Sequence, residues 1–212
     1  MSSEQLQGFF ESTMGQVAVV AAILLLFLGI LVSGKGKKTD TRALVTSAIL
    51  VALALALNQI VLFRMPQGGS VTAFSMLPIV LCAQFFGLRR GLMAGMCVGL
   101  IDLIFNPYVI HPVQMILDYP LAYGALAFAA LIPAKKAGII PSYVVGVAGR
   151  YLCAVMSGII FFGAYAPEGF NAVTWSLWYN ITYLAAEGGL TILLLLIPGF
   201  RKVIHQLNDR IS

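Results

Sequence analysis

The sequence predicts an all-α integral membrane protein. Of its 212 residues, 60% are hydrophobic and only 10% are charged. The apolar residues form long runs and the charged residues form short clusters between them, which is the pattern of helices that cross a bilayer of about 30 Å. A net charge of +5 that is distributed in this way indicates membrane topology and does not favour nucleic-acid binding.

Seven apolar runs have lengths suited to membrane spans. The first extends from Gln16 to about Val32, and its positive charges follow it, which favours a retained helix over a cleaved signal peptide. The remaining runs lie at about 43–62, 73–88, 91–106, 113–133, 139–164 and 173–198. The residues alone therefore predict a bundle of membrane helices.

Basic residues recur on one side of the expected bundle. They are Lys35, Lys37, Lys38 and Arg42, then Arg89 and Arg90, Lys135 and Lys136, and finally Arg201, Lys202 and Arg210. Under the positive-inside rule this side is cytoplasmic. We therefore expect a multi-pass protein of the cell membrane with its N-terminus outside and its C-terminus in the cytoplasm.

The stretch from Asn106 to Tyr123 combines a Pro-broken turn with an apolar helix that carries Asp118. A carboxylate within a membrane helix costs roughly 2.5–3.5 kcal/mol on insertion scales, so it faces a cavity, a ligand or a partner helix. Tyr108, Tyr119 and Tyr123 lie close to it in the sequence. A carboxylate among aromatic rings suits a cationic or amine-rich small molecule. The alternative is that a neighbouring helix satisfies Asp118.

Other charges also lie in apolar runs. Asp102 and Glu187 are two further carboxylates, and Arg150 is a cation. We expect Arg150 to pair with a carboxylate and hold the bundle together, and a proton or ion path is the alternative.

Small residues recur every fourth position in two ladders: Ala48, Ala52 and Ala56, then Gly87, Gly91, Gly95 and Gly99. Such ladders let helices approach closely in lipid. We expect the Gly ladder to pack inside the bundle, whereas the Ala ladder fits an external helical partner equally well. Pro78 and Pro120 predict kinks or local unwinding.

Motifs of enzymes and metal sites are missing from the sequence. It has neither HExxH nor GxSxG, and the Gly34–Lys38 run lacks the Walker A spacing. Cys82, Cys97 and Cys153 stand singly, without metal-ligand spacing. We therefore expect no enzyme activity, no cofactor and no metal, and any ATPase would be a separate chain.

Several blocks of residues together share the pattern of one family. They are 65–71 (MPQGGSV), 76–79 (MLPI), 111–114 (HPVQ), 117–119 (LDY), 150–151 (RY), 157–158 (SG), 161–163 (FFG), 165–169 (YAPEG), Ser176, Tyr179, Asn180 and Tyr183. Over roughly residues 43–200 the chain resembles the thiamine-specific substrate-binding (S) component of energy-coupling factor (ECF) transporters, the ThiT or YuaJ type.

This resemblance implies a six-helix S-component bundle at 43–200, with a substrate pocket near the outer surface that is closed by the loop after its first helix. Residues 1–42 would then add one transmembrane helix and a basic cytoplasmic linker, and 201–212 would form a basic cytoplasmic tail. The family works with an ECF coupling subunit and two ATPase subunits. No partner other than these, lipid and the small-molecule substrate is expected.

The resemblance also implies roles for particular residues. Asp118 would face the aminopyrimidine of the substrate. The other implied substrate-binding residues are Tyr119, Tyr108, Asn180, Phe162, Trp175 and Gly158. The lid loop would comprise Pro66, Gln67, Gly68, Gly69 and Ser70, and Ala48, Ala52 and Ala56 would contact the coupling subunit. Two positions depart from the family: Ala154 replaces a common His, and Trp175 replaces a usual Tyr.

These departures leave alternatives to thiamine open. The favoured function is the substrate-binding subunit of a thiamine importer. The same architecture could instead bind a related vitamin or precursor, such as pyridoxine or a hydroxymethylpyrimidine. A solitary transporter driven by protons through Asp102, Glu187 or Asp118 is the third hypothesis.

Overall fold

The computed structural model describes residues 13–33 and 40–211, and they are mostly helical. The helices are α2 (Thr13–Ser33), α3 (Thr41–Asn58), α4 (Met76–Phe86), α5 (Leu88–Phe105), α6 (Pro112–Ile116), the π-helix η1 (Leu117–Leu121), α7 (Ala122–Ala125), the 3₁₀ helix η2 (Leu126–Leu131), α8 (Ala134–Ala137), α9 (Ile139–Phe161), the 3₁₀ turn η3 (Gly163–Tyr165), α10 (Ala172–Leu196) and α11 (Pro198–Ile211). Two short strands, β1 (Val61–Arg64) and β2 (Ser70–Thr72), pair as an antiparallel hairpin.

Within the described residues, four helical stretches are long and apolar enough to cross a membrane: Thr41–Asn58, Pro112–Leu131, Ile139–Phe161 and Ala172–Leu196. Each coincides with a predicted run. The predicted 73–88 run forms only the 11-residue helix α4. The predicted 43–62 run was too long, because its last residues leave the helix after Asn58 and join the hairpin.

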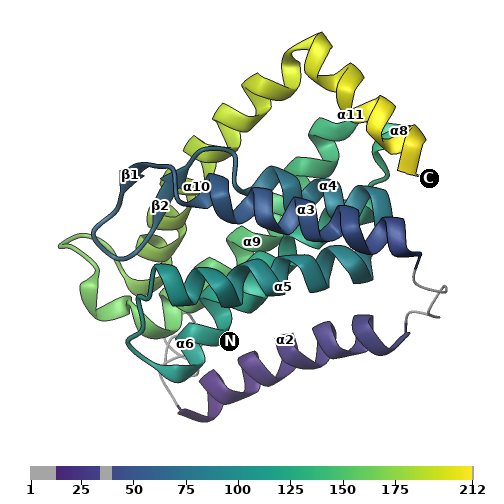
Figure 1. The fold of residues 1–212 in the computed structure, drawn as a ribbon. Coiled ribbons are helices and arrows are strands. Elements are labelled where there is room, and N and C mark those ends of the chain that lie inside the picture. The colour runs from purple at the N-terminus through teal and green to yellow at the C-terminus, as the bar shows by residue number, and fades with distance from the viewer. Residues whose placement is uncertain (1–12, 34–39, 212) are drawn as a thin grey trace.

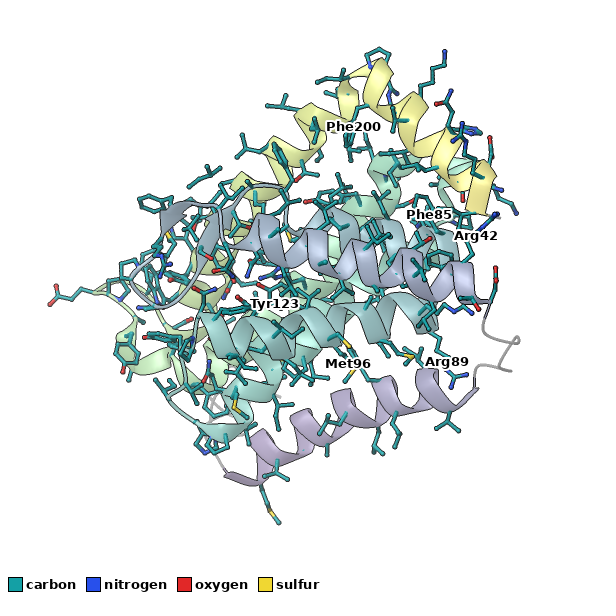
Figure 2. All side chains as sticks on the ribbon, viewed as in Figure 1. Arg42, Phe85, Arg89, Met96, Tyr123 and Phe200 are labelled. Carbon is teal, nitrogen blue, oxygen red and sulfur yellow. The ribbon has the colours of Figure 1, made fainter. Side chains whose placement is uncertain are left out.

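The bundle has two different ends (Figure 1). The β1–β2 hairpin, α6 and the loop after α9 gather at one end, whereas α8 and the C-terminal part of α11 lie at the other. Figure 2 shows Arg42 and Arg89 at the end away from the hairpin. Arg42 and Arg89 therefore lie at the opposite end of the bundle from the hairpin, which itself carries Arg64.

The core of the bundle depends on close helix packing at the Gly ladder. A Cβ atom placed on Gly95 would collide with the backbone oxygen of Tyr123, and one on Gly99 would collide with that of Tyr119. Only glycine permits α5 to approach η1 and α7 this closely. The prediction that this ladder packs inside the bundle is confirmed for these positions, whereas Gly87 instead forms the joint between α4 and α5 with a φ of 86°.

The two ends of the chain add helices to this core. Helix α2 lies alongside α5 (Figure 1), and its Phe27 is buried and contacts the edge of the Phe128 ring at a centroid distance of 6.0 Å. The predicted polar tail is helical: α11 packs Phe200 and Ile204 against the core and leaves Arg201 exposed.

Candidate functional site

A cavity of about 520 Å³ lies beneath the hairpin, which is a volume typical of small-molecule sites. The lid loop, α5, η1, α9 and α10 all contribute residues to its wall. Every residue implied as substrate-binding lines it: Tyr108, Asp118, Tyr119, Gly158, Phe162, Trp175 and Asn180. So do the lid residues Pro66, Gln67, Gly68, Gly69 and Ser70.

Asp118 is half-buried and lies in the π-helix η1, which also contains Pro120. Proline lacks a backbone N–H and disturbs the regular helix, and single π-turns of this kind are frequent at functional sites. The prediction of local unwinding at Pro120 is therefore confirmed. The wider turn presents Asp118 to the cavity.

Gln114 holds the Asp118 carboxylate in place. Its side-chain N–H donates to Asp118 Oδ2 at 2.6 Å and to the Tyr108 carbonyl at 3.0 Å, while its Oε1 accepts from Ile110 N at 3.2 Å. Gln114 is buried. With all its groups used, Gln114 cannot turn away, so it fixes one oxygen of Asp118 at the cavity wall.

Aromatic side chains form the wall next to Asp118. The Tyr119 hydroxyl accepts from Tyr108 N and donates to the Asn106 carbonyl, both at 2.7 Å, and so fixes the turn before α6. The Tyr108 ring stacks on Phe162 with a centroid distance of 6.1 Å and an interplanar angle of 18°. This pair presents π-faces to the cavity, and such faces attract cations.

Helix α10 binds the loop of residues 66–70 by three hydrogen bonds. The Tyr179 hydroxyl accepts from Gln67 N at 2.9 Å and from Gly69 N at 3.3 Å. The Trp175 indole N–H donates to Gln67 Oε1 at 3.2 Å. A Cβ on Gly69 would lie 2.8 Å from the Tyr183 ring, so the loop backbone rests directly on aromatic side chains.

Asn180 makes its hydrogen bonds within the protein. Its Nδ2 donates to the carbonyls of Ser176 at 2.9 Å and Ala154 at 3.3 Å, and its Oδ1 accepts from the Tyr183 hydroxyl at 2.9 Å. At Gly158 a Cβ would collide with Ser176 Oγ. These contacts join α9 to α10 along the cavity wall.

The expected pairing of Arg150 with a carboxylate is wrong for the described part of the chain. Asp102 accepts instead from Asn106 Nδ2 at 2.9 Å, from the Tyr123 hydroxyl at 2.8 Å and from Asn58 Nδ2. Neutral donors thus satisfy this buried carboxylate. The Arg150 guanidinium lies 4.0 Å from the centroid of the Tyr123 ring.

Glu187 is likewise satisfied without a cation. Its Oε2 accepts from Thr72 N at 3.1 Å and Thr72 Oγ1 at 2.8 Å, and its Oε1 accepts from Ser75 Oγ at 2.9 Å and Met76 N at 3.4 Å. The carboxylate therefore joins α10 to the end of the hairpin and the start of α4.

Sequence reasoning placed Tyr123 beside Asp118 but missed several other residues of the cavity wall: Asn58, Asp102, Gln114, Arg150, Ser157, Ser176 and Tyr183. Ser176 and Tyr183 lie on α10 at helical spacing from Asn180. A polar stripe on this apolar helix was the signal that could have identified them. Among the described residues, no group of three or more His, Cys, Asp or Glu side chains is arranged to hold a metal.

Comparisons with known proteins agree with this architecture. The model of the family described as "Thiamine transporter protein (Thia_YuaJ)" matches residues 44–205. The chain is 36% identical over 157 residues to the thiamine transporter ThiT of Bacillus subtilis, covering 66% of this chain and 81% of that protein. It is 32% identical over 159 residues to ThiT of Lacticaseibacillus paracasei, covering 63% and 75%. The solved structure of ThiT from Listeria monocytogenes superposes with a TM-score of 0.61 at 26% identity, covering 75% of this chain and 96% of that one.

Proposed function

The chain belongs to the thiamine transporter (Thia_YuaJ) family, and from this premise we propose that it is the substrate-binding membrane subunit of a thiamine importer. The observation that carries the proposal is a half-buried carboxylate, Asp118, in a cavity of aromatic residues under a closed lid. Neither hydrolysis nor group transfer is part of this function, so the protein is a transporter component and not an enzyme.

The chemistry of thiamine fits this cavity. Thiamine joins an aminopyrimidine to a permanently charged thiazolium ring. Asp118 accepts a hydrogen bond from the amino group, with Tyr119 beside it. The π-faces of Tyr108, Phe162 and Trp175 stabilise the cation, at about 0.5–2 kcal/mol for each well-placed ring.

Asn180 and Gly158 shape the cavity in this proposal. The Asn180 amide is engaged with Ser176, Ala154 and Tyr183, which supports a role in holding the wall beside the ligand. Gly158 leaves room for the Ser176 hydroxyl where a side chain would clash.

A related ring compound is the second candidate ligand. Ala154 lines the cavity with a methyl group where the resemblance implies a histidine, and the Trp175 N–H is used by the lid. Both features leave fewer hydrogen bonds for thiamine. Pyridoxine and hydroxymethylpyrimidine are therefore the ligands to test beside it.

Transport would require separate coupling and ATPase subunits. Ala48, Ala52 and Ala56 are exposed on α3, and the neighbouring Ile49 and Leu53 are also exposed. A smooth face of this kind suits close contact with a membrane helix of a coupling subunit. For a solitary proton-driven carrier there is less support, because neutral donors satisfy Asp102 and Glu187.

We further propose six transmembrane segments within 43–200 and an additional one at α2. The hairpin end would face outward and the basic end the cytoplasm, in accord with Arg42 and Arg89 lying away from the lid (Figure 2). The N-terminus would then be outside and the C-terminus inside.

A thermal-shift panel on purified protein tests the ligand. We expect thiamine to raise the melting temperature at micromolar concentration, and pyridoxine or hydroxymethylpyrimidine to raise it less. Stabilisation by another of these compounds without stabilisation by thiamine would reject the proposal. Uptake into liposomes that contain this chain alone, under a pH gradient, would reject the need for ATPase subunits.

A further inference from the structure

The Ser157 hydroxyl is an unused polar group in the cavity wall. Ser157 is 1% exposed, and within the described residues its Oγ has no hydrogen-bond partner. The only other such buried atom in those residues, the Tyr143 hydroxyl, does not line the cavity. Leaving a buried hydroxyl unpaired is unfavourable, so a partner supplied by a ligand would remove that penalty.

Ser157 lies near the carboxylate that we propose as the primary ligand contact. It comes from α9 and Asp118 from η1, and both line the same cavity. The two side chains are close enough to interact, although no hydrogen bond between them satisfies the usual geometry. An acceptor and an unused donor are thus side by side.

Five other neutral donors of the cavity wall are already engaged. Gln114 donates to the Asp118 carboxylate and the Tyr108 carbonyl, and Tyr119 donates to the Asn106 carbonyl. Tyr123 donates to Asp102, Ser176 to the Val155 carbonyl, and Tyr183 to Asn180 Oδ1. The hydroxyls of Tyr108 and Tyr179 belong to residues that contact Gly68 and Gly69 of the lid. Ser157 is therefore a fully buried neutral donor next to Asp118 whose hydroxyl has no partner within the described residues.

An aminopyrimidine presents the complementary pair of groups. Its amino N–H is a donor, and the adjacent ring nitrogen is an acceptor. A carboxylate alone satisfies only the amino group and leaves the adjacent ring nitrogen without a partner from the protein.

We infer that Ser157 is a ligand-contacting residue that donates a hydrogen bond to the ring nitrogen beside the amino group bound by Asp118. This inference rests on the proposed function and extends it to the discrimination among ring compounds. It also gives the cavity a polar contact on α9 one turn from Ala154, where the family's histidine is missing.

The test compares two ligands on three proteins by calorimetric titration. The ligands are thiamine and its analogue in which that ring nitrogen is replaced by C–H. For the wild type we expect roughly fivefold weaker binding of the analogue. Ser157→Ala should bind thiamine roughly fivefold more weakly and bind both ligands equally, because the donor is gone. Ser157→Cys, with a weak S–H donor, should fall between them.

Ser142→Ala is the matched control. Ser142 is also buried on α9, but its hydroxyl donates to the carbonyls of Ile132 at 2.5 Å and Gly138 at 3.0 Å, and it does not line the cavity. This variant should lower the melting temperature and keep the wild-type preference between the ligands. If Ser157→Ala retains that preference while the wild type binds thiamine, the inference on Ser157 is wrong and the proposed function stands. If the wild type binds no thiamine, the proposed function itself fails.

Discussion

Replacing Asp118 by asparagine tests the central contact of the site. The Gln114 amide is fixed by Tyr108 and Ile110, so its N–H continues to point at position 118. The asparagine side chain in Asp118→Asn must therefore turn its oxygen toward Gln114 and its N–H₂ toward the ligand. The amino group of an aminopyrimidine then meets a donor instead of an acceptor.

The loss of affinity can be estimated from this geometry. A hydrogen bond to a charged group contributes about 1.5–3 kcal/mol, which corresponds to roughly 10- to 150-fold in Kd. Because the new N–H₂ also opposes the ligand's own donor, we expect a loss in the upper half of this range. Asp118→Glu keeps the charge and should lose much less.

Fluorescence gives a direct assay. Of the two tryptophans, Trp175 lines the cavity, and Trp178 is 59% exposed. In a Trp178→Phe background, thiamine should quench the remaining Trp175 signal, and the titration gives Kd. Asp209→Asn removes a carboxylate from the exposed surface of α11 and should leave Kd unchanged. A Kd for Asp118→Asn within twofold of the parent would refute the role of Asp118.

Three further outcomes follow from the same geometry. Gly69→Ala places a methyl group 2.8 Å from the Tyr183 ring, so it should speed ligand release at least fivefold in stopped-flow measurements. The control Gly189→Ala, whose new Cβ would have no atom within 4 Å, should not change the release rate. Ala52→Leu on the exposed face of α3 should leave thiamine affinity intact and reduce uptake when the coupling and ATPase subunits are present; full uptake would argue against contact there. Deletion of residues 1–40, which lie outside the matched region 44–205, should leave Kd within threefold, as measured by titration.

Much of the fold and of the cavity wall could be predicted from the sequence, for one physical reason. Polar side chains are costly in lipid. Asp118 and Asn180 lie within apolar helices, so their side chains were expected to face a cavity. Pro120 and the Gly95–Gly99 spacing carried equally direct signals, since each changes backbone geometry or the approach of helices.

What failed were the pairings between helices. Helical spacing shows which face of a helix a charged residue occupies, but it does not show which residue pairs with it. The neutral hydrogen-bond donors of Asp102 therefore could not be predicted from the sequence. The Val61–Arg64 strand was also missed, because a short apolar run that continues a helix looks the same in either conformation. Ser157 was overlooked as a binding residue because only the surrounding contacts show that its hydroxyl is unused.

Helix α10 contacts the lid loop at both its tip and its base. Tyr179 and Trp175 bind the tip of the lid, while Glu187 binds Thr72 and the start of α4, where the helix dipole also favours a carboxylate. These contacts span about 18 Å of one helix, at 1.5 Å per residue between positions 175 and 187. Any displacement of α10 away from α9 would therefore loosen the lid at its tip and at its base together. Because Asn180 hydrogen-bonds to Ala154 across the wall between α9 and α10, the same movement would also disturb that wall, and we expect ligand capture and release both to depend on this interface.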